Sequence, residues 1–516
     1  MEMKRILSIT ALLFATTLNL NAQTSFPRSE KEDVQGYMSK AYWALWNEEE
    51  QARIDADIER YRKSDAEITL PNIAKNSDVK IEQISHHFIF GAHIFNYNQL
   101  GKKEYNDRYK ELYGTLFNSA TIPFYWREFE TEPNRLRFAT EYWDTEEYWN
   151  NCPDPYDQPH WRRPSTDQLV EFCQQKGIRP HGHVLVWGNR KWHHPEWMLE
   201  TMTPAEREAY AKFFPNEPNR FRDEDAMTEE YKNLSADEVG NIFKHYADTL
   251  TYVYDQRIRR IAEHYKSTVK SWDVVNESAV DYERGNLIEN HTISKTRYGL
   301  MHGDMDYKAL QSAKKYFPAE VKLNINDYQL TDGYKQQIAR LIERDCKIDI
   351  VGLQMHLFNP QSCVDIANGA NIQTPQGVRK MIENFKELKL PLHLSEITIT
   401  SPSADDKGYM IQAIITQNLY RLWFSMEYMM GITWWNVVDN CGAKGEPSTS
   451  GLFFRDMREK PVYHAMNNLI NNEWTTRLTI KADKQGKVSF RGFKGKYRIT
   501  WTDKSGHEQS MEYNLE

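Results

Sequence analysis

The stretch "VKSWDVVNES" (residues 269–278) decides the fold. Its strand-like run ends abruptly on an amide and a carboxylate, Asn276 and Glu277. A short apolar run of this kind indicates a buried strand. A single glutamate at the tip of such a strand is more often a salt-bridged structural residue than a functional one. Its meaning therefore depends on what lies at the ends of the other strands.

Seven further apolar runs share this character, and amphipathic helical patterns lie between them. The runs are 88–94, 117–124, 178–187, 321–327, 347–354, 391–397 and 431–438. Eight strands, each followed by a helix, predict an α/β fold with a closed parallel (β/α)₈ TIM barrel. An open doubly wound sheet is the alternative, but no glycine-rich phosphate loop follows the first strand.

The chain of 516 residues divides into four predicted parts. Residues 1–22 read as a signal peptide and 23–77 as a charged helical segment. Residues 78–472 form the predicted barrel, with a polar rim insertion at about 188–240. Residues 473–516 switch to short alternating strands separated by glycine-containing turns, which predicts a small β appendage packed on the barrel. A carbohydrate-binding role for this appendage is one option.

The N-terminus predicts export. Lys4 and Arg5 precede an apolar stretch that runs to about Leu20, and a small-residue cleavage site follows Ala22. This is the pattern of a secretory signal peptide, and the stretch is too short and too rich in threonine for a membrane span. A buried N-terminal helix is the alternative. We therefore predict a secreted or periplasmic protein without membrane insertion.

Composition excludes some functions. The formal net charge of −8 argues against nucleic acid or an anionic membrane as a partner. The five cysteines are odd in number and widely spaced, which argues against a disulfide framework and against a cysteine metal site. The 15 Trp and 29 Tyr residues suit a saccharide binder or simply a large barrel. We predict a monomer that needs no cofactor or metal.

Polar residues gather at the predicted strand ends. In a (β/α)₈ barrel the active-site groups sit at the carboxyl ends of the strands. Six of those ends carry such groups: His181, His183 and Trp187; Asn276 and Glu277; Asn326, Asp327 and Tyr328; Gln354 and His356; Ser395 and Glu396; and Trp435, Asn436 and Asp439. Their coincidence at one pocket mouth favours a functional site.

Two glutamates across such a pocket suit the cleavage of an acetal. A glycosidic bond needs a proton at the leaving oxygen and electron density at the anomeric carbon. The pKa of the proton donor must be raised by its surroundings and by the second carboxylate. Gln354 and His356 are placed to hold the nucleophile and sugar hydroxyls. Asn276 suits the sugar 2-hydroxyl, a contact that strengthens in the transition state.

The motifs "WDVVNES", "HLSEITI", "HGHVLVW", "LNINDYQL", "GLQMHLF" and "GITWWNVVDN" together resemble glycoside hydrolase family 10, the retaining endo-β-1,4-xylanases. The resemblance covers roughly residues 78–470. It implies that Glu277 is the general acid/base and Glu396 the nucleophile, with carboxyl groups about 5–5.5 Å apart. It implies that Tyr328 lies on the aglycone side. The residues that it places around the breaking bond are His183, Trp187, Asn276, Gln354, His356 and Trp435.

The chain departs from the family on the glycon side. On strand two the family has a Glu-Asn pair and a Lys, where this chain has Pro123, Phe124 and Arg127. Gly188 replaces a His after strand three, and a second Trp after strand eight has no clear counterpart. We therefore expect a substrate that is decorated or differs from plain xylan. Arg127 either pairs with a uronic acid carboxylate or forms a local structural ion pair.

Three other functions are alternatives to a xylanase. The altered glycon side and the rim insertion favour an exo-acting or side-chain-directed β-glycosidase on another hemicellulose. A non-catalytic glycan-binding protein would have no need of a proton donor, which both glutamates and His356 argue against. A metal-dependent hydrolase would use the pairs His193–His194 or His86–His87. Neighbouring side chains there point apart, and no carboxylate stands at ligand spacing.

Overall fold

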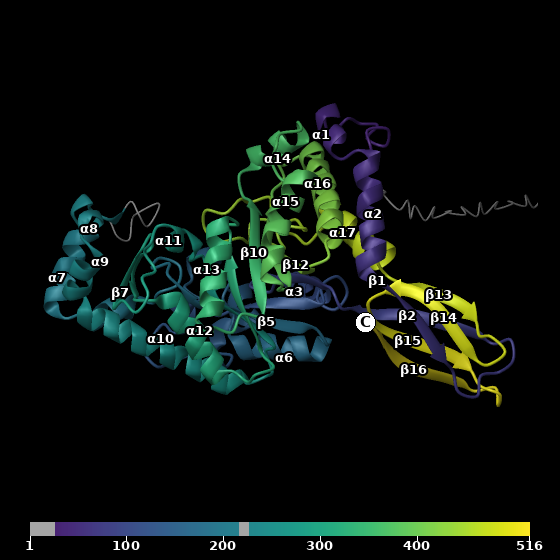
Figure 1. The fold of residues 1–516 in the computed structure, drawn as a ribbon, viewed down its shortest axis with the longest axis horizontal. Coiled ribbons are helices and arrows are strands. Elements are labelled where there is room, and N and C mark those ends of the chain that lie inside the picture. Colours follow the sequence, from purple (N-terminus) through teal and green to yellow (C-terminus); the bar gives the residue numbers. More distant parts are fainter. Residues whose placement is uncertain (1–25, 216–225) are drawn as a thin grey trace, which may run out of the picture.

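The computed structural model describes residues 26–215 and 226–516, and its centre is a closed barrel of eight parallel strands (Figure 1). In order around the barrel, they are β3 (Ile89–His93), β4 (Ser119–Pro123), β5 (Arg179–Trp187), β6 (Ser271–Asn276), β9 (Lys322–Asp327), β10 (Ile350–Leu357), β11 (Leu392–Ile399) and β12 (Met429–Trp434). Pairing of β12 with β3 closes the barrel. The predicted (β/α)₈ fold is confirmed, and each strand overlaps one of the predicted apolar runs. The predicted signal peptide lies outside the described residues.

Helices follow the strands of the barrel; all but the last of them connect one strand to the next, and α17 follows β12, the last strand. The principal ones are α3 (Lys103–Glu111), α6 (Thr166–Lys176), α10 (Lys244–Tyr265), α12 (Met305–Tyr316), α13 (Asp332–Glu343), α15 (Pro375–Phe385), α16 (Asp406–Phe424) and α17 (Pro461–Asn467). Their apolar faces explain the packing, as in α6, where Leu169, Val170 and Cys173 are buried. Gly177 ends that helix with a φ of 66°, a conformation that glycine adopts without steric cost.

Shorter elements fill the connections. They are α4 (Trp126–Phe129), η1 (Tyr142–Asp144), α5 (Glu146–Asn150), η2 (Pro155–Asp157), α11 (Ala279–Glu283), α14 (Pro360–Ala367), η5 (Lys386–Leu388) and η6 (Asn468–Glu473). The part of the rim insertion that is described contains η3 (Glu196–Thr201), α7 (Pro204–Phe213), α8 (Glu229–Asn233) and α9 (Ala236–Ile242). A two-stranded hairpin of β7 (Ile293–Thr296) and β8 (Gly299–His302) follows β6 and was not predicted.

The N-terminal helices α1 (Lys40–Leu45) and α2 (Glu48–Arg62) pack on the outside of the barrel. Gln51 of α2 donates a hydrogen bond of 2.9 Å to Asn418 of α16. An ion pair of 2.7 Å joins Asp55 to Arg421 of the same helix. Of the predicted helical segment, only Lys40–Leu45 and Glu48–Arg62 are helical, and residues 26–39 form turns and irregular structure.

The predicted boundaries between the helical segment, the barrel and the appendage are wrong for residues 63–86. We expected helix as far as 77 and barrel from 78, but β1 (Lys63–Thr69) and β2 (Asp78–His86) are strands of the appendage. β1 pairs with β14 (Lys487–Phe493), and the second sheet has the order β13-β2-β15-β16, with β13 (Arg477–Lys481), β15 (Gly495–Thr502) and β16 (Glu508–Leu515). Figure 1 shows the purple and yellow strands interleaved beside the barrel.

The burial pattern of β2 explains why this strand belongs to the appendage rather than to the barrel. Val79, Ile81 and Gln83 point to one face and are buried, which is the period-2 alternation of a half-buried strand. That face packs on Tyr497, Ile499 and other residues contributed by the C-terminal strands. The appendage therefore has a core built from both flanks of the barrel, which suits the rule that about 40 residues rarely hold a core alone.

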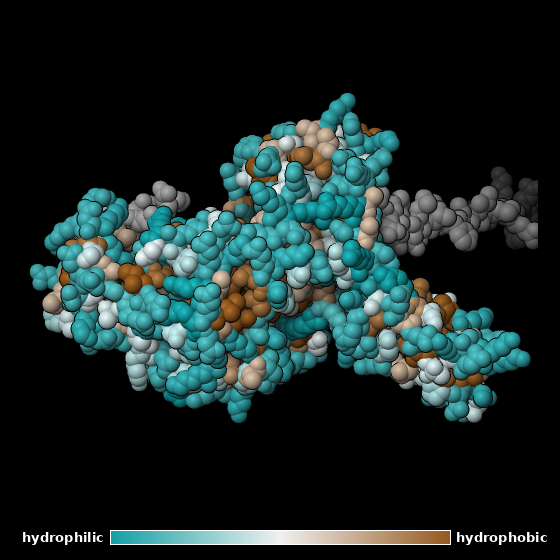
Figure 2. Space-filling view, in the orientation of Figure 1, coloured by the Kyte–Doolittle hydropathy of each residue, from teal (hydrophilic) through white to brown (hydrophobic). Residues whose placement is uncertain are grey.

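The exterior is mostly polar. Hydrophilic residues cover most of the face in Figure 2, with scattered apolar residues between them. In the two described ranges, no helix is both long and apolar enough to cross a membrane. All five cysteines are described and none is in a disulfide.

The shared core of the appendage predicts the effect of truncating Ile499. The side chain is fully buried, so we expect Ile499→Ala to lower the free energy of unfolding by about 2–5 kcal/mol. Arg498 is the neighbouring residue on the exposed face of β15. Arg498→Ala should change the free energy of unfolding by less than about 0.5 kcal/mol. Chemical unfolding followed by circular dichroism measures both. Equal effects would contradict the assignment of this face to a core.

Candidate active site

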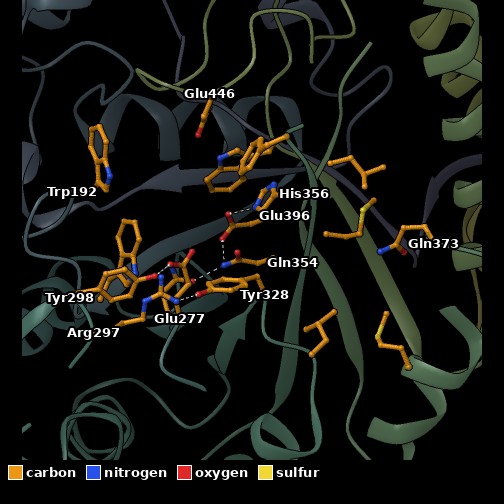
Figure 3. A pocket seen from close by; sticks show the side chains of 18 of the residues that line it. Trp192, Glu277, Arg297, Tyr298, Tyr328, Gln354, His356, Gln373, Glu396 and Glu446 are labelled. Carbon is orange, nitrogen blue, oxygen red and sulfur yellow. Dashed lines mark hydrogen bonds and ion pairs between the residues drawn. The ribbon is translucent and has the colours of Figure 1, made fainter. Parts of the chain in front are cut away.

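One cavity of about 790 Å³ opens at the carboxyl ends of the barrel strands. Eight of the residues predicted from the sequence line it: Trp187, Asn276, Glu277, Tyr328, Gln354, His356, Glu396 and Trp435. Figure 3 shows Glu277 and Glu396 approaching one another with Gln354 between them. We call this space the catalytic pocket.

Glu277 occupies a strained position directly after β6. Its φ of 53° is in the left-handed region, which is uncommon for a residue with a side chain. Its backbone N–H donates a hydrogen bond of 2.8 Å to the carbonyl of Asn326. The Tyr298 hydroxyl donates one of 3.0 Å to Glu277 Oε2. Burial, and then the nearby Glu396 carboxyl, raise the pKa of Glu277 to about 7.

Glu396 lies within β11 and accepts hydrogen bonds from two amides. Asn326 Nδ2 donates to its Oε1 at 2.7 Å, and Gln354 Nε2 donates to the same oxygen at 3.1 Å. Both amides also donate to Asn276 Oδ1, at 3.0 and 3.1 Å. Burial raises the pKa of Glu396 to about 7. The four polar side chains form one network, which fixes the direction of the Glu396 carboxyl.

Two histidines flank Glu396. His183 Nε2 is 3.7 Å from Glu396 Oε1, and His356 Nε2 is 3.4 Å from Glu396 Oε2. His356 Nδ1 lies 2.9 Å from the Thr398 hydroxyl, and burial lowers the pKa of His356 to about 4. His356 is therefore neutral at pH 7, and with Thr398 donating to Nδ1, its Nε2–H faces the carboxylate.

His183 sits behind the pocket wall rather than in it, with 1% of its surface exposed. Its Nδ1 and His181 Nε2 both contact Asp273 Oδ2 at 2.9 Å. Burial acts to raise the pKa of Asp273, but the two imidazoles outweigh it and hold that pKa well below its usual range. Asp273 therefore stays ionised and orients both rings.

The two glutamates differ in the hydrogen-bond donors that surround them. Hydrogen-bond donors to an ionised carboxylate favour its charged form. Glu396 has two amide donors and two imidazoles around it, whereas Glu277 has a phenol and faces Glu396. Near neutral pH the pair therefore holds its first negative charge on Glu396, and Glu277 keeps its proton.

Several lining residues escaped sequence reasoning. They are Tyr125, Trp192, Arg297, Tyr298, Phe358, Gln373 and Glu446, among others. Tyr298 and Arg297 belong to the turn of the β7–β8 hairpin, and the alternation in "ISKTRYGLMH" is a signal that would have revealed it. Arg297 donates a hydrogen bond to the Tyr328 hydroxyl. Glu446 lies in an irregular loop, where no pattern indicates its position.

Phe124 and Arg127, which we expected on the glycon side of the site, do not line the catalytic pocket. Phe124 is fully buried and packs on Trp272, with ring centroids 4.7 Å apart. The next residue, Tyr125, lines the pocket instead, with its ring 5.4 Å from that of His183. Arg127 lies outside the catalytic pocket. It donates to the Lys191 carbonyl at 2.8 Å and pairs with Glu196 at 3.1 Å. These are the contacts of a local structural ion pair.

No group of three or more metal-ligating side chains occurs in residues 26–215 and 226–516. The pair His193–His194 is buried, and His194 Nε2 contacts the Tyr254 hydroxyl at 2.8 Å. The side chains that line the pocket supply carboxyl, amide, imidazole and phenol groups. A closed (β/α)₈ barrel with buried Glu396 and partly buried Glu277 facing one another at the mouth is typical of a barrel enzyme of the glycoside hydrolase class.

The chain belongs to glycosyl hydrolase family 10, whose family model matches residues 82–469. It is 23% identical to endo-1,4-beta-xylanase C of Paenibacillus barcinonensis over 77% of this chain and 32% of that protein. It is 22% identical to the anti-sigma-I factor RsgI6 of Acetivibrio thermocellus over 68% of this chain and 36% of that protein. The chain thus spans about a third of the length of these curated relatives. Among solved structures, xylanase 10B of Thermotoga maritima aligns at 19% identity with a TM-score of 0.49, over 75% of this chain and 96% of that one.

Tyr298 allows a test of the electrostatics at Glu277. Its hydroxyl stabilises the ionised carboxylate and so lowers the pKa of Glu277. Activity that needs protonated Glu277 falls as the pH rises through that pKa, about 7. Tyr298→Phe removes the donor, so the alkaline limb of kcat/KM should move up by about half to one pH unit. Tyr316→Phe on the outer face of α12, where the hydroxyl contacts Asp255, should leave the limb in place. A shift to lower pH would contradict the assigned hydrogen bond.

Proposed function

We propose that the protein is a retaining glycoside hydrolase that cleaves β-1,4 linkages in xylan-type polysaccharide, with endo-xylanase-like action. The observation that carries this proposal is the pair formed by partly buried Glu277 and buried Glu396, which have unequal hydrogen-bond surroundings. Membership of glycosyl hydrolase family 10 supports the reaction class. Its partners are then polysaccharide or oligosaccharide chains, and it acts as a monomer without a cofactor.

In the proposed first step, Glu277 donates its proton to the glycosidic oxygen while ionised Glu396 attacks the anomeric carbon. The bond to the leaving sugar breaks and a glycosyl ester forms on Glu396. Asn326 and Gln354 hold the attacking carboxylate in line through their amide N–H groups. Partial burial and the neighbouring Glu396 carboxyl keep the pKa of Glu277 raised.

In the second step, Glu277 is ionised and removes a proton from water, which attacks the same carbon and releases Glu396. Two inversions leave the anomeric configuration unchanged. Asn276 is proposed to bind the sugar 2-hydroxyl, because its side chain belongs to the network around Glu396. Trp187, Trp435 and His356 are proposed to contact the sugar at the breaking bond, Tyr328 the sugar on the aglycone side, and His183 to support Glu396 from behind the wall.

The finer parts of the proposal concern location and substrate. The positive region and apolar stretch before residue 22 support export to the periplasm or the cell exterior. The replacement of the family's strand-two pair by Pro123 and Phe124 supports a chain that carries side groups. Buried Phe124 leaves Tyr125 as the strand-two residue in the pocket, so the glycon sugar meets an aromatic ring there.

Removal of either glutamate tests the reaction. Glu277→Ala should lower kcat/KM on linear xylo-oligosaccharides by about 10²–10⁴-fold, because proton donation is lost. Glu396→Ala should abolish turnover because no covalent intermediate forms. Glu320→Ala, on the exposed surface, serves as the control. Product sizes by chromatography separate endo from exo action, and NMR of the first product shows its anomeric configuration. Inverted product, or full activity without Glu396, would refute the mechanism.

A further inference from the structure

A second cavity of about 620 Å³ adjoins the catalytic pocket. We call it the basic cavity. Its walls come from α4, the segment 156–163, the loop after β5 and the loop after β12. Trp192 lines both spaces, so the two are neighbours. Its ionisable lining residues are five basic ones, Arg127, Arg162, Arg163, Lys191 and Lys444, and three acidic ones, Glu128, Asp157 and Glu196.

An excess of basic groups is unexpected in a chain with a formal net charge of −8. Three of the five cations have internal partners. Arg127 pairs with Glu196, Lys444 lies 3.7 Å from Asp157, and Arg162 contacts Asn436 Oδ1 at 3.2 Å. The remaining two, Arg163 and Lys191, have no carboxylate within ion-pair distance in the part of the chain that is described.

Arg163 packs against aromatic rings, and the carboxylates of Glu128 and Glu446 act on it only from beyond ion-pair distance. Its guanidinium lies 4.0 Å from the centre of the Tyr125 ring and 4.8 Å from that of Phe95. Its Nη1 donates a hydrogen bond of 3.0 Å to the Arg162 carbonyl, whereas its Nε has no partner. Because Tyr125 also lines the catalytic pocket, this cation stands directly behind the wall that faces the substrate.

Lys191 reaches the cavity from the loop after β5. Its ammonium lies 4.6 Å from the centre of the Trp192 ring. Trp192 is 37% exposed and Tyr156 45% exposed, and Tyr156 packs on Trp161 with ring centroids 4.1 Å apart. The cavity therefore combines unpaired cations with open aromatic faces. Sugar rings stack on such faces, and a carboxylate is the natural partner for a guanidinium and an ammonium.

We propose that the basic cavity binds a uronic acid residue of the substrate, with its carboxylate held by Lys191 and Arg163 and its ring against Trp192. The proposal rests on the proposed hydrolase function and names the decoration that such a substrate carries. Arg127 then acts indirectly. Its bonds to the Lys191 carbonyl and to Glu196 fix the segment that presents Lys191 and Trp192.

The test compares two xylo-oligosaccharides of equal length, one with a uronic acid branch and one with that carboxyl group reduced to the alcohol. The full-length protein should show kcat/KM about tenfold higher on the acidic substrate at low salt, as one charge-assisted contact predicts. Added salt should reduce this ratio. Lys191→Met keeps the aliphatic stem on Trp192 and removes the charge. It should lower kcat/KM on the acidic substrate about tenfold more than on the reduced one.

Two further variants act as controls. Lys191→Arg should keep the preference for the acidic substrate, because the charge remains. Lys484→Met removes one exposed charge in the appendage and should change neither rate. Equal kcat/KM on the two substrates for the unaltered protein would overturn the proposal, as would an equal loss on both in Lys191→Met with native thermal stability.

A binding measurement separates this proposal from the hydrolase function. Calorimetry of the Glu277→Gln variant with each oligosaccharide reports the cavity without turnover. If neither substrate is cut by the unaltered protein but the acidic one binds about tenfold more tightly, the hydrolase function fails and the cavity assignment holds. If linear xylo-oligosaccharides are cut and the two ligands bind equally, the cavity assignment fails and the hydrolase function holds.

Discussion

Closure of the barrel is the constraint on which the site depends. Parallel strands bring their carboxyl ends to one rim, and the pairing of β12 with β3 bends that rim into a ring. Residues from β6 and β11, far apart in the chain, then face one another across a single pocket. An open sheet would leave Glu277 and Glu396 along an edge, where water would solvate both and remove the reason for their raised pKa values.

The amide network gives the two carboxyl groups different chemistry in the same pocket. Burial raises the pKa of both to about 7, and each pKa unit corresponds to about 1.4 kcal/mol. The amides of Asn326 and Gln354 donate to Glu396 and favour its ionised form, and the resulting charge helps keep Glu277 protonated. The unequal distribution of donors therefore supports the proposed roles of Glu277 as the acid and Glu396 as the nucleophile at the same pH.

The sequence predicted the elements that are buried on both faces and close to their partners in the chain. The eight barrel strands appear as apolar runs because helices cover them, and eight of the lining residues lie at their ends or just beyond. β1 and β2 were assigned to the wrong parts of the chain because their partners follow about 400 residues later, and the alternation in β2 does not reveal with which strands it pairs. Tyr298 and Glu446 were missed because loops, rather than strand ends, carry them.

Arg127 shows why substrate preference is harder to predict than the reaction. From its position on strand two it was a candidate for a direct contact with an acidic sugar. In the folded chain the segment after β5 supplies Glu196 and the Lys191 carbonyl as its partners. Among the cations of the basic cavity, Lys191 and Arg163 are then the two with no carboxylate at ion-pair distance in residues 26–215 and 226–516. The two glutamates proposed to react are placed by the barrel strands, whereas the basic cavity is assembled largely from connecting segments. Loop changes can therefore alter the substrate without disturbing the amides that hold Glu396.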